Sequence, residues 1–591
     1  MKRSTSVVCT TNTLTNRVQL KFDYDPGIIA IIKMIRGAQF DKGWTIPRTE
    51  FVAFADTVGM NRVETDDEAL RMEMKQWQDF DEPTTVIPTL APQFPTWTAL
   101  AEPAKAYTGE DFQAVGTTWL VQNPRGIFAD DMGLGKTKQF IDAVWHVYSG
   151  LTTPERYDVL IVCKAINIDT WYGEITKWCP QAKVFTLDGT VSQRQKTWVA
   201  LTHFNGINYV VVSYETFCTD SRNDRFNPYN LQWIWVALDE AHKVKSSPLN
   251  GNQSQIAQEL HELYAQRMHA ITGTPIINAA EDAWNILYWL GLETREFGKF
   301  AADTLLLNEL GFAGKSHWSK KLKVVTGYKP KGMLLLRRKL RTSMLRRMKR
   351  DKLPGLPAIT HQTLTVQLNP EETRFYNEAM KDFVFDPQGE VIVAPQLLRD
   401  IDTSDGERIP NKFTRTLRLT QITSSLEGII GKPYQSSKIK AAISLAADAV
   451  ASGQKVLIFS QFRSAVSGLS AAAQVAGFRP AVVQGGVSDK ARAEMVRRFQ
   501  EEPDCKLFIG TSAACREGLT LTAGSYMIHL DEEWSPAYVQ QLEDRICRIG
   551  QTNAMTVVTI RAVQSNGKPT VDDKKTRTLA RKDALVEQLM P

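Results

Sequence analysis

Short, strongly apolar runs recur along most of the chain, and the segments between them are long enough for helices. Runs that are apolar throughout are typical of strands buried on both faces of a parallel sheet. The runs fall into two sets, which predicts two α/β lobes. The first set is GIFAD, YDVLIVC, YVVVSY, WIWVALD and HAITGTP, and the second is KVLIFS, PAVVQGG, KLFIGTS, YMIHLD and TVVTI.

The remaining segments carry different patterns. Between the two sets, helical patterns and many charges predict a helical insertion that also connects the lobes. Near the amino terminus, Asp25 precedes isoleucines at helical spacing, which predicts a helix start. Residues 61–106 turn acidic and then Pro-rich, which is typical of an extended connector. The expected units are a small α+β accessory domain with its linker (1–95), lobe 1 (96–291), the helical insertion (292–435), and lobe 2 with a closing helix in its tail (436–591).

Composition narrows the class of protein. The 591 residues are 43% hydrophobic and 23% charged, which excludes a disordered chain and a small stapled scaffold. A net charge of +6 is too small over this length to indicate nucleic acid by itself. The seven cysteines form no close pair, so neither disulfides nor zinc is expected, and no apolar stretch suits a membrane helix. We expect a cytoplasmic protein of a bacterial or virus-infected cell, associated with the nucleoid, or a nuclear one if the source is eukaryotic.

The first apolar run leads into a glycine-rich loop, DDMGLGKT, followed by a helical pattern. Its glycines let successive backbone N–H groups turn toward an anion, and the helix start adds its positive dipole end. Lys136 can reach the β- and γ-phosphates of a nucleotide, and the Thr137 hydroxyl can bind Mg²⁺. Asp130 replaces the first glycine of the general pattern, and a glycine-rich turn with a structural lysine is the alternative. The loop residues expected around the nucleotide are Asp131, Met132, Gly133, Leu134, Gly135, Lys136 and Thr137.

The run WIWVALDEAH ends in two carboxylates, Asp239 and Glu240. A buried strand delivers such residues to the carboxyl edge of the sheet, where ligands of open α/β folds bind. We expect Asp239 to hold Mg²⁺ through water and Glu240 to polarise the attacking water. Adjacent ionised carboxylates are costly without a cation or solvent, so a metal accounts for them. A solvated acidic helix cap is the alternative.

DEAH after a phosphate loop resembles the superfamily-2 helicases, and GIFAD with DDMGLGKT resembles their Swi/Snf-type branch. Further matches follow in order over residues 105–565, although Ala165 stands where the family usually has proline. The resemblance implies an α/β fold of two RecA-like parallel-sheet lobes with helical insertions. It also implies ATP as the nucleotide and Gln113, after Phe112, as the residue that reads the adenine edge. The other matching segments are VLIVCKAINIDTWYGEITKW, VVVSYETF, ITGTPIINAAEDAW and, between the lobes, MLRRMKRDKLPGLP.

The most telling match in the second lobe is QLEDRICRIGQ, residues 541–551. Arg545 and Arg548 lie three residues apart on an expected helix and so project from a similar face. The resemblance implies that they are arginine fingers, which stabilise charge on the γ-phosphoryl group and make hydrolysis depend on closure of the lobes. Two surface arginines on a helix are the alternative.

One departure from the main family pattern and one amino-terminal resemblance point to a subgroup. Cys515 and Arg516 stand where most of the family has two glycines, and SAACREGLTLT resembles the annealing-helicase subgroup instead. The amino-terminal segment resembles the HARP domain found beside that motor. Phe40 and Trp44, with basic neighbours, suit stacking on branched DNA, whereas the alternative is that Trp44 closes a small core. The HARP resemblance rests mainly on Tyr24, Asp25, Pro26, Lys33, Trp44 and Pro47.

The family resemblance also places DNA contacts at the edges of both sheets, where polar groups grip the backbone without reading bases. Trp534 matches a family tryptophan near DNA, and a core aromatic is the alternative. Nine Lys or Arg within residues 337–352 either contact phosphates or form a solvated charged face. The expected DNA-binding residues are Lys164, Ser213, Tyr214, Gln461, Arg463, Gly485, Gly486, Ser512 and Trp534.

Together with the sites above, the resemblance implies a DNA-stimulated ATPase that uses ATP and Mg²⁺, translocates on double-stranded DNA and remodels or reanneals forked DNA in DNA repair. A remodeller that displaces proteins from DNA is one alternative. A non-hydrolysing DNA-binding scaffold is the other, and the presence of all the expected catalytic charges argues against it. Those charges are Lys136, Asp239, Glu240, Arg545 and Arg548.

Overall fold

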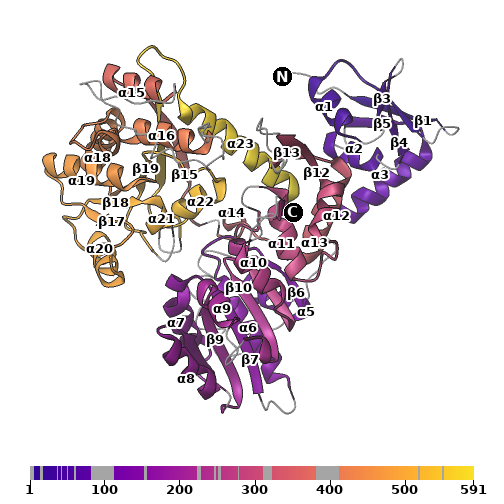
Figure 1. The fold of residues 1–591 in the computed structure, drawn as a ribbon, viewed down its shortest axis with the longest axis horizontal. Coiled ribbons are helices and arrows are strands. Elements are labelled where there is room, and N and C mark those ends of the chain that lie inside the picture. The colour runs from indigo at the N-terminus through magenta and orange to yellow at the C-terminus, as the bar shows by residue number, and fades with distance from the viewer. Residues whose placement is uncertain are drawn as a thin grey trace, which may run out of the picture.

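The computed structural model contains an amino-terminal unit followed by two lobes, with a connecting segment between the lobes (Figure 1). The structure describes residues 6–12, 17–35, 38–40, 43–48, 51–58, 62–81, 112–151, 156–201, 203–222, 228–244, 248–249, 254–276, 279–310, 322–353, 355–380, 412–516, 519–548 and 551–590. The domain boundary expected near residue 95 lies outside the described residues.

The amino-terminal unit packs helices on a five-stranded sheet of order β3-β4-β2-β1-β5. Its elements are β1 (Val7–Asn12), β2 (Arg17–Lys21), α1 (Pro26–Met34), β3 (Gln39–Phe40), β4 (Trp44–Pro47), α2 (Phe51–Val58), β5 (Val63–Thr65) and α3 (Glu68–Asp81). The Asp25 side chain accepts hydrogen bonds from the N–H groups of Gly27 and Ile28, which confirms the predicted helix start. β5 and α3 lie where an extended connector was expected, because Leu70 and Met74 of α3 supply apolar positions to this core.

Lobe 1 is built on a parallel sheet of order β14-β6-β11-β10-β7-β9-β8. Its strands include every apolar run of the first set. Its elements are α5 (Phe112–Gln122), β6 (Arg125–Phe128), α6 (Lys136–Ser149), β7 (Arg156–Cys163), α7 (Ile168–Trp178), β8 (Lys183–Leu187), α8 (Val191–Leu201), β9 (Gly206–Ser213), α9 (Tyr214–Asp220), β10 (Trp233–Asp239), α10 (Gln255–His261), β11 (Ala265–Ile271), α11 (Ala280–Trp289) and α12 (Phe297–Thr304).

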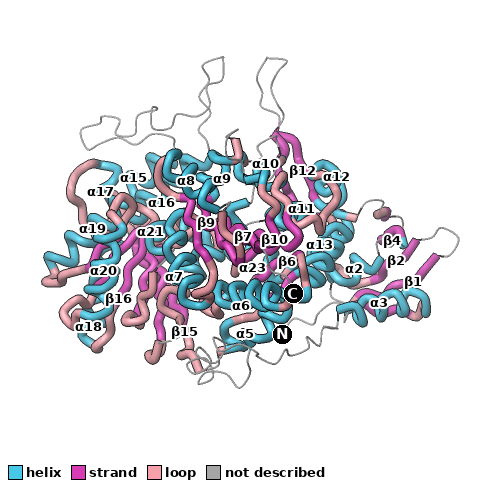
Figure 2. Tube along the Cα trace, turned by 90° about the horizontal axis from the view of Figure 1, so that it is seen from below, coloured by secondary structure: helices cyan, strands magenta, loops and turns pink. Residues whose placement is uncertain are grey.

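Both faces of this sheet are covered, as the apolar runs predict. Figure 2 shows α5 and α6 on one face and α9, α10 and α11 on the other. Successive residues of β7 alternate between the two cores: Leu160 and Val162 pack with α9 to α11, and Val159 and Ile161 pack with α5 to α7. Because both cores depend on the same strands, the carboxyl ends of those strands are held rigidly at one edge of the sheet.

Lobe 2 repeats this design on a parallel sheet of order β15-β20-β19-β16-β18-β17. Two parallel-sheet lobes confirm the predicted fold class. The elements are β15 (Ile359–Gln367), α15 (Pro370–Met380), α16 (Lys412–Ser424), α17 (Glu427–Ile430), α18 (Ser437–Ala451), β16 (Val456–Ser460), α19 (Arg463–Val475), β17 (Ala481–Val483), α20 (Asp489–Glu501), β18 (Leu507–Thr511), α21 (Ser512–Cys515), β19 (Tyr526–His529), α22 (Pro536–Glu543), β20 (Met555–Val563) and α23 (Val571–Leu589).

The segment between the lobes, expected to be helical, contributes strands to both sheets. It contains β12 (Leu305–Leu310), β13 (Leu322–Tyr328), α13 (Pro330–Ser343), β14 (Met344–Leu345) and α14 (Lys349–Lys352) before β15. β12 and β13 form an antiparallel pair, β14 extends the lobe 1 sheet beside β6, and β15 extends the lobe 2 sheet beside β20. The helical insertion and connector expected over 292–435 therefore also contains strands, and residues 381–411 of it lie outside the described residues.

The tail forms the expected closing helix, α23, which bridges the two lobes (Figure 1). At its start, the Asp572 carboxylate lies 2.6 Å from Lys438 Nζ and accepts from the N–H of Ala562, both in lobe 2. At its end, Leu589 and Met590 are buried in the larger core of lobe 1, where α13 also packs. A cavity of about 580 Å³ remains where α23 passes α1, β13 and α13.

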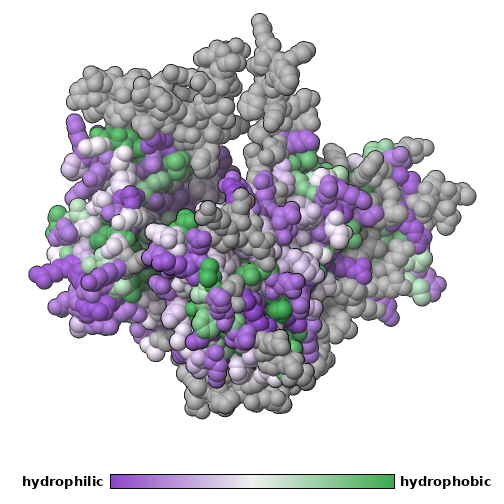
Figure 3. Space-filling model, turned by 60° about the horizontal axis from the view of Figure 1, so that its bottom comes forward, coloured by the Kyte–Doolittle hydropathy of each residue, from purple (hydrophilic) through white to green (hydrophobic). Residues whose placement is uncertain are grey.

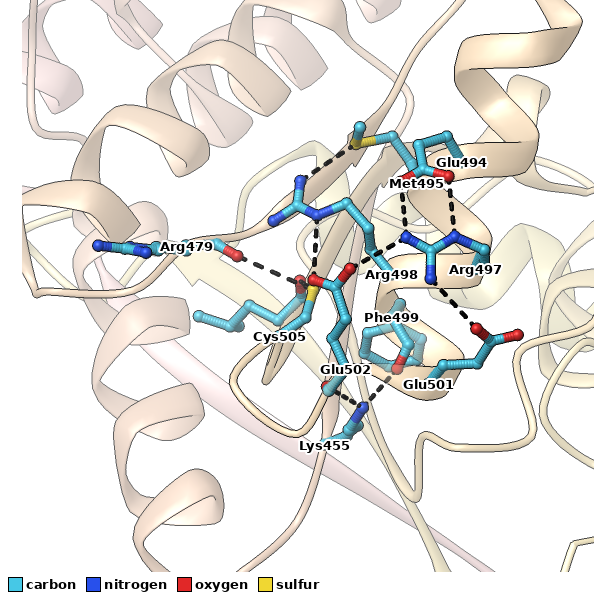
Figure 4. Close-up of polar contacts among 11 residues, drawn as sticks. Lys455, Arg479, Glu494, Met495, Arg497, Arg498, Phe499, Glu501, Glu502 and Cys505 are labelled. Atoms are coloured by element: carbon cyan, nitrogen blue, oxygen red, sulfur yellow. Dashed lines mark hydrogen bonds and ion pairs between the residues drawn. The ribbon is translucent and has the colours of Figure 1, made fainter.

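Polar contacts fix the carboxyl end of α20 (Figure 4). Lys455 Nζ donates to the carbonyl oxygens of Phe499 (2.5 Å) and Glu502 (2.8 Å) at the end of the helix. On the exposed side, Arg497 forms ion pairs with three glutamates, Glu494, Glu501 and Glu502. Because exposed ion pairs contribute little, Lys455 is the stronger anchor of this helix end.

On the face shown in Figure 3, hydrophobic residues are scattered among hydrophilic ones. Among the exposed hydrophobic residues, Tyr172 of α7 is 48% exposed and Val475 of α19 is 82% exposed. Within the described part of the chain, no helix combines the length and apolar character needed to cross a membrane.

Candidate active site

The phosphate loop lies between β6 and the first turn of α6. Gly133 (φ 88°) and Gly135 (φ 77°) adopt left-handed conformations that favour glycine. A Cβ on Gly135 would also lie 2.5 Å from Nε2 of Gln113, so the predicted adenine-reading residue is packed against the loop. Lys136 Nζ donates to the carbonyl oxygens of Asp130 (2.7 Å) and Asp131 (3.2 Å), which places the ammonium group within the loop. This geometry suits an anion.

Asp130, which replaces the usual first glycine, is fully buried and forms an ion pair. Arg347 Nε donates to its Oδ1 (2.9 Å), and Arg347 Nη2 donates to its Oδ2. The same guanidinium also donates to the Phe112 carbonyl and to Gln139 Oε1. The departure from the general pattern therefore anchors the connecting segment beneath the phosphate loop.

The basic run 337–352 also contributes a second buried contact, through Lys349. Its backbone N–H donates to Asp131 Oδ2 (2.8 Å), and its Nζ donates to Asp544 Oδ1 (2.5 Å) of lobe 2. Arg347 thus joins the connecting segment to the phosphate loop, and Lys349 joins the same loop to lobe 2. Neither role was among the two interpretations of the basic run, DNA contact and a solvated charged face.

The predicted carboxylates end β10 and lie close to the loop side chains. Asp239 Oδ2 accepts hydrogen bonds from Asn167 Nδ2 (3.1 Å) and Trp171 Nε1 (3.0 Å). Burial raises the pKa of Asp239, and the neighbouring charge of Glu240 raises it further. Glu240 has φ 51°, a left-handed conformation that costs a non-glycine residue roughly 1–3 kcal/mol and is concentrated at functional sites.

Basic side chains surround Glu240. Burial acts to raise its pKa, but the hydrogen bond with His242 and the nearby Lys164 and Lys136 ammonium groups outweigh burial and lower the pKa. His242 Nδ1 lies 3.1 Å from Glu240 Oε2, and Lys164 Nζ lies 3.5 Å from His242 Nε2. An ionised Glu240 can orient and polarise a water molecule. Lys164, expected at the DNA edge, is only 8% exposed and belongs by position to this cluster.

The predicted arginine fingers come from lobe 2. α22 ends at Glu543, so Arg545 and Arg548 lie in the turn after the helix and not on it. Arg545 Nη2 lies 3.8 Å from Met132 Sδ of the phosphate loop, so this guanidinium reaches the other lobe. Arg548 Nε donates to the Asp544 carbonyl (2.8 Å), and its Nη1 donates to Thr520 Oγ1 (3.1 Å). The structure therefore brings Arg545 to the loop and holds Arg548 in the same turn.

These residues fit a nucleoside triphosphate with Mg²⁺. Thr137 on the first turn of α6 and Asp239 supply the hard oxygen ligands that Mg²⁺ prefers, and Lys136 and Arg545 supply cations for phosphate. Among the described residues, Thr274 Oγ1 is buried without a hydrogen-bond partner, and the neighbouring Gly273 lies near Lys136 Nζ. An unsatisfied hydroxyl beside the loop is the kind of group that a bound polar ligand satisfies.

Some predicted DNA contacts have other roles. Tyr214 is fully buried, and its hydroxyl donates to the Asp239 carbonyl oxygen (2.8 Å). Ser213 caps α9 by accepting from the N–H of Thr216 (3.0 Å). Ser512 is 1% exposed. Their side chains are covered by protein in this structure, and contact of these three residues with DNA stays a prediction.

Other predicted DNA residues lie at one edge of lobe 2. Arg463 is exposed, and its Nη2 lies 2.9 Å from where a Cβ on Gly486 would be, next to Gly485. Gln461 precedes Arg463, and its N–H donates to a buried carboxylate. Trp534 is partly buried and packs against the core formed by α15, α16 and α17, as the core alternative expects. DNA contact by Arg463 and its neighbours stays a prediction.

Sequence reasoning missed several residues of this site. Asn167 and Trp171, which hold Asp239, occur in the segment after β7, and His242 belongs to the DEAH motif itself. Arg347 and Lys349 occur in MLRRMKRDK, which resembles the family's interlobe stretch. All five residues lie within segments that match the family, and this could have marked them as candidates. The spacing of residues along the chain does not predict which side chains they contact.

Comparisons with known proteins agree with this site. The model of the SNF2-related domain matches residues 69–420, and that of the helicase conserved C-terminal domain matches residues 437–550. An uncharacterized ATP-dependent helicase of Mycoplasma genitalium is 25% identical and covers 81% of this chain. The DNA annealing helicase and endonuclease ZRANB3 of Mus musculus is also 25% identical and covers 76%.

The chain spans only 42% of the length of the Mycoplasma relative and 38% of the length of the mouse relative. A solved structure of the Sulfolobus solfataricus SWI2/SNF2 ATPase core in complex with dsDNA is 22% identical, with a TM-score of 0.35; the match covers 77% of this chain and 87% of that one. The SNF2-related model alone spans more than half of the present sequence. The chain therefore belongs to the SNF2-related family.

Proposed function

We propose that this chain is a DNA-stimulated ATPase that translocates on double-stranded DNA. The observation that carries the proposal is the 3.8 Å approach of Arg545, from lobe 2, to Met132 in the phosphate loop of lobe 1. A nucleotide bound at that loop contacts both lobes, so binding favours closure and hydrolysis removes the γ-phosphate that both lobes hold. Alternation between closed and open lobes is the movement that a translocase requires.

Each charged group has a distinct role in this cycle. Lys136 binds the β- and γ-phosphates, Thr137 and Asp239 would hold Mg²⁺, and Glu240 orients the attacking water and receives its proton. Mg²⁺, when bound, neutralises phosphate charge. Arg545 stabilises the charge that develops on the transferred phosphoryl group, and it is in place only when the lobes are closed. Arg548, held in the same turn, supports this role.

The choice of DNA as the track rests on the relatives and on one exposed edge. Curated relatives are named as DNA helicases, among them the Arabidopsis thaliana DDM1 and the mouse annealing helicase. At the edge of lobe 2, exposed Arg463 lies against the Gly485–Gly486 turn, where Gly486 has φ 91°. A guanidinium beside exposed backbone N–H groups suits a phosphate backbone and reads no sequence.

We further propose that the motor belongs to the annealing-helicase subgroup and acts on forked DNA. Cys515, a mark of that subgroup here, is fully buried, and a Cβ on Gly510 would lie 2.3 Å from its Sγ, so the pair is matched in size. On the amino-terminal unit, Tyr24 is 83% exposed and Phe40 is 67% exposed, with the Phe40 ring 5.1 Å from that of Trp44. Exposed aromatic rings suit stacking on unpaired bases at a fork.

The first experiment measures phosphate release with no DNA and with single-stranded, duplex and forked DNA. We expect duplex DNA to raise the rate and forked DNA to raise it further, and we expect fork regression without displacement of a strand from a blunt duplex. Hydrolysis that no DNA stimulates would refute the translocase. Equal stimulation by duplex and fork, with no regression, would refute only the annealing assignment.

A further inference from the structure

Lys349, the first residue of α14, bonds to both lobes by different groups. Its backbone N–H donates to Asp131 Oδ2 of the phosphate loop (2.8 Å). Its Nζ donates to Asp544 Oδ1 (2.5 Å) and to the Cys547 carbonyl oxygen (2.8 Å) in lobe 2. Only 6% of the residue is exposed, so the contact is removed from solvent. One residue therefore spans the distance between the loop and the opposite lobe.

The lobe 2 end of this contact is the turn that carries both arginines. Asp544 immediately precedes Arg545, and its carbonyl oxygen accepts from Arg548 Nε (2.8 Å). Lys349 Nζ binds Asp544 at the start of the turn and Cys547 near its end. Burial raises the pKa of Asp544, and the Lys349 ammonium group opposes that rise. The position of the turn relative to the phosphate loop thus depends on this lysine.

We propose that Lys349 is a positioning residue for ATP hydrolysis: it sets the arginine-bearing turn against the phosphate loop and acts through Asp544 on Arg545. The inference deepens the assigned ATPase activity and rests on it. A displacement of about 1 Å of a catalytic group can lower the reaction rate about 100-fold. Loss of a fixed spacing between the loop and the arginine should therefore lower the rate of hydrolysis measurably.

The two bonds of Lys349 can be separated by substitution. Any side chain at this position keeps the backbone N–H that holds Asp131, so Lys349→Met removes only the bonds to lobe 2. The phosphate loop should then bind ATP as before, while the arginine turn loses its spacer. A DNA-contact role for the same lysine predicts a different result, because DNA affinity would fall and ATP turnover at saturating DNA would not.

The experiment measures steady-state ATP hydrolysis at saturating duplex DNA for the parent chain, Lys349→Met and a matched control, Lys440→Met. Lys440 is an exposed lysine on α18, far in sequence from the site. We expect kcat to fall about 10- to 100-fold in Lys349→Met with KM for ATP within about threefold of the parent. The control should match the parent. A fall in ATP affinity without a fall in kcat overturns the proposal.

A double variant keeps the test decisive if the unpaired Asp544 destabilises Lys349→Met. Lys349→Met with Asp544→Leu removes both buried charges, and its melting temperature should return toward that of the parent. Its kcat should stay as low as the lower of the two single variants. Losses that multiply across the two sites would mean independent effects and would overturn the pairing.

A distance measurement separates positioning from a merely structural role. All seven native cysteines are buried, so Tyr172→Cys in lobe 1 and Val475→Cys in lobe 2 provide two exposed labelling sites. With a non-hydrolysable ATP analogue, we expect the parent to show one high-transfer population and Lys349→Met to show a broader, lower one. Identical populations with reduced kcat would overturn the proposal. A parent chain that hydrolyses no ATP would instead refute the ATPase assignment.

Discussion

Replacing Asp130 by glycine restores the general phosphate-loop pattern, yet we predict that it destabilises this protein. Asp130 is fully buried, and its carboxylate is the ionic partner of Arg347, a residue that is itself only 9% exposed. In Asp130→Gly the guanidinium keeps Gln139 and the Phe112 carbonyl as hydrogen-bond acceptors but has no counter-charge. A glycine at position 130 is therefore unfavourable in this chain, because the connecting segment places the Arg347 guanidinium beside that position.

The size of the effect follows from burial. Removing one partner of a buried ion pair costs about 3–5 kcal/mol, because the remaining charge is left without compensation. Added backbone freedom from the glycine costs roughly 0.5–1 kcal/mol more. Domains are stable by only about 5–15 kcal/mol, so this loss would lower the midpoint of unfolding in urea markedly.

The assay is urea unfolding followed by tryptophan fluorescence for the parent, Asp130→Gly, Asp130→Asn and Asp130→Gly with Arg347→Met. Asp130→Asn keeps the shape of the side chain and removes its charge, so its loss of stability isolates the ionic part. The double variant removes both charges and should recover part of the loss. If Asp130→Gly unfolds at the same urea concentration as the parent, the reasoning from the buried pair fails.

Three further predictions follow from single sites. Glu240→Gln should bind nucleotide within about threefold of the parent but lower DNA-stimulated phosphate release about 100-fold or more; release at the parent rate would exclude Glu240 as the base. Burial acts to raise the pKa of Glu293, but Arg295 and Lys339 lower it to about 2, so its stabilisation is complete above pH 4.5 and lost as pH falls toward 2. Thermal unfolding should therefore show Glu293→Gln less stable at pH 7, with a gap that narrows in acid; a constant gap contradicts the assignment. Lys455→Met should lower stability by about 1–2 kcal/mol in urea unfolding, because two carbonyls at the end of α20 lose a charged donor, whereas no change would make that contact incidental.

The parts of the fold and site that could be predicted share a local cause. Strands buried on both faces are apolar throughout, and the phosphate loop and the carboxylates follow such strands directly, so one stretch of sequence contains both the element and its function. β15 was not predicted as a strand. It lies at the edge of the sheet and most of its side chains are exposed, so its sequence ITHQTLTVQ has no apolar run. β14 was not predicted either, because a strand of two residues is too short to show an alternating pattern.

Contacts between distant residues could not be predicted from pattern. Arg347 and its partner Asp130 are 217 positions apart, and Lys349 and Asp544 are 195 apart. A basic run shows that charge is present, but which carboxylate it meets depends on how two sheets are placed. Tyr214 is a further case: the family resemblance placed it among the DNA contacts at the sheet edge, whereas at the start of α9 its ring is buried in the core.

The closing helix α23 limits how far the two lobes can move apart. Its first turn is tied to lobe 2 by the Asp572 ion pair, and its last residues are embedded among apolar side chains of lobe 1. A wide separation of the lobes must either extract Leu589 and Met590 into water or drag α13 along with lobe 2. In the proposed translocase, the anchored α23 would thus limit how far the lobes separate in each cycle, in addition to the limit set by the nucleotide.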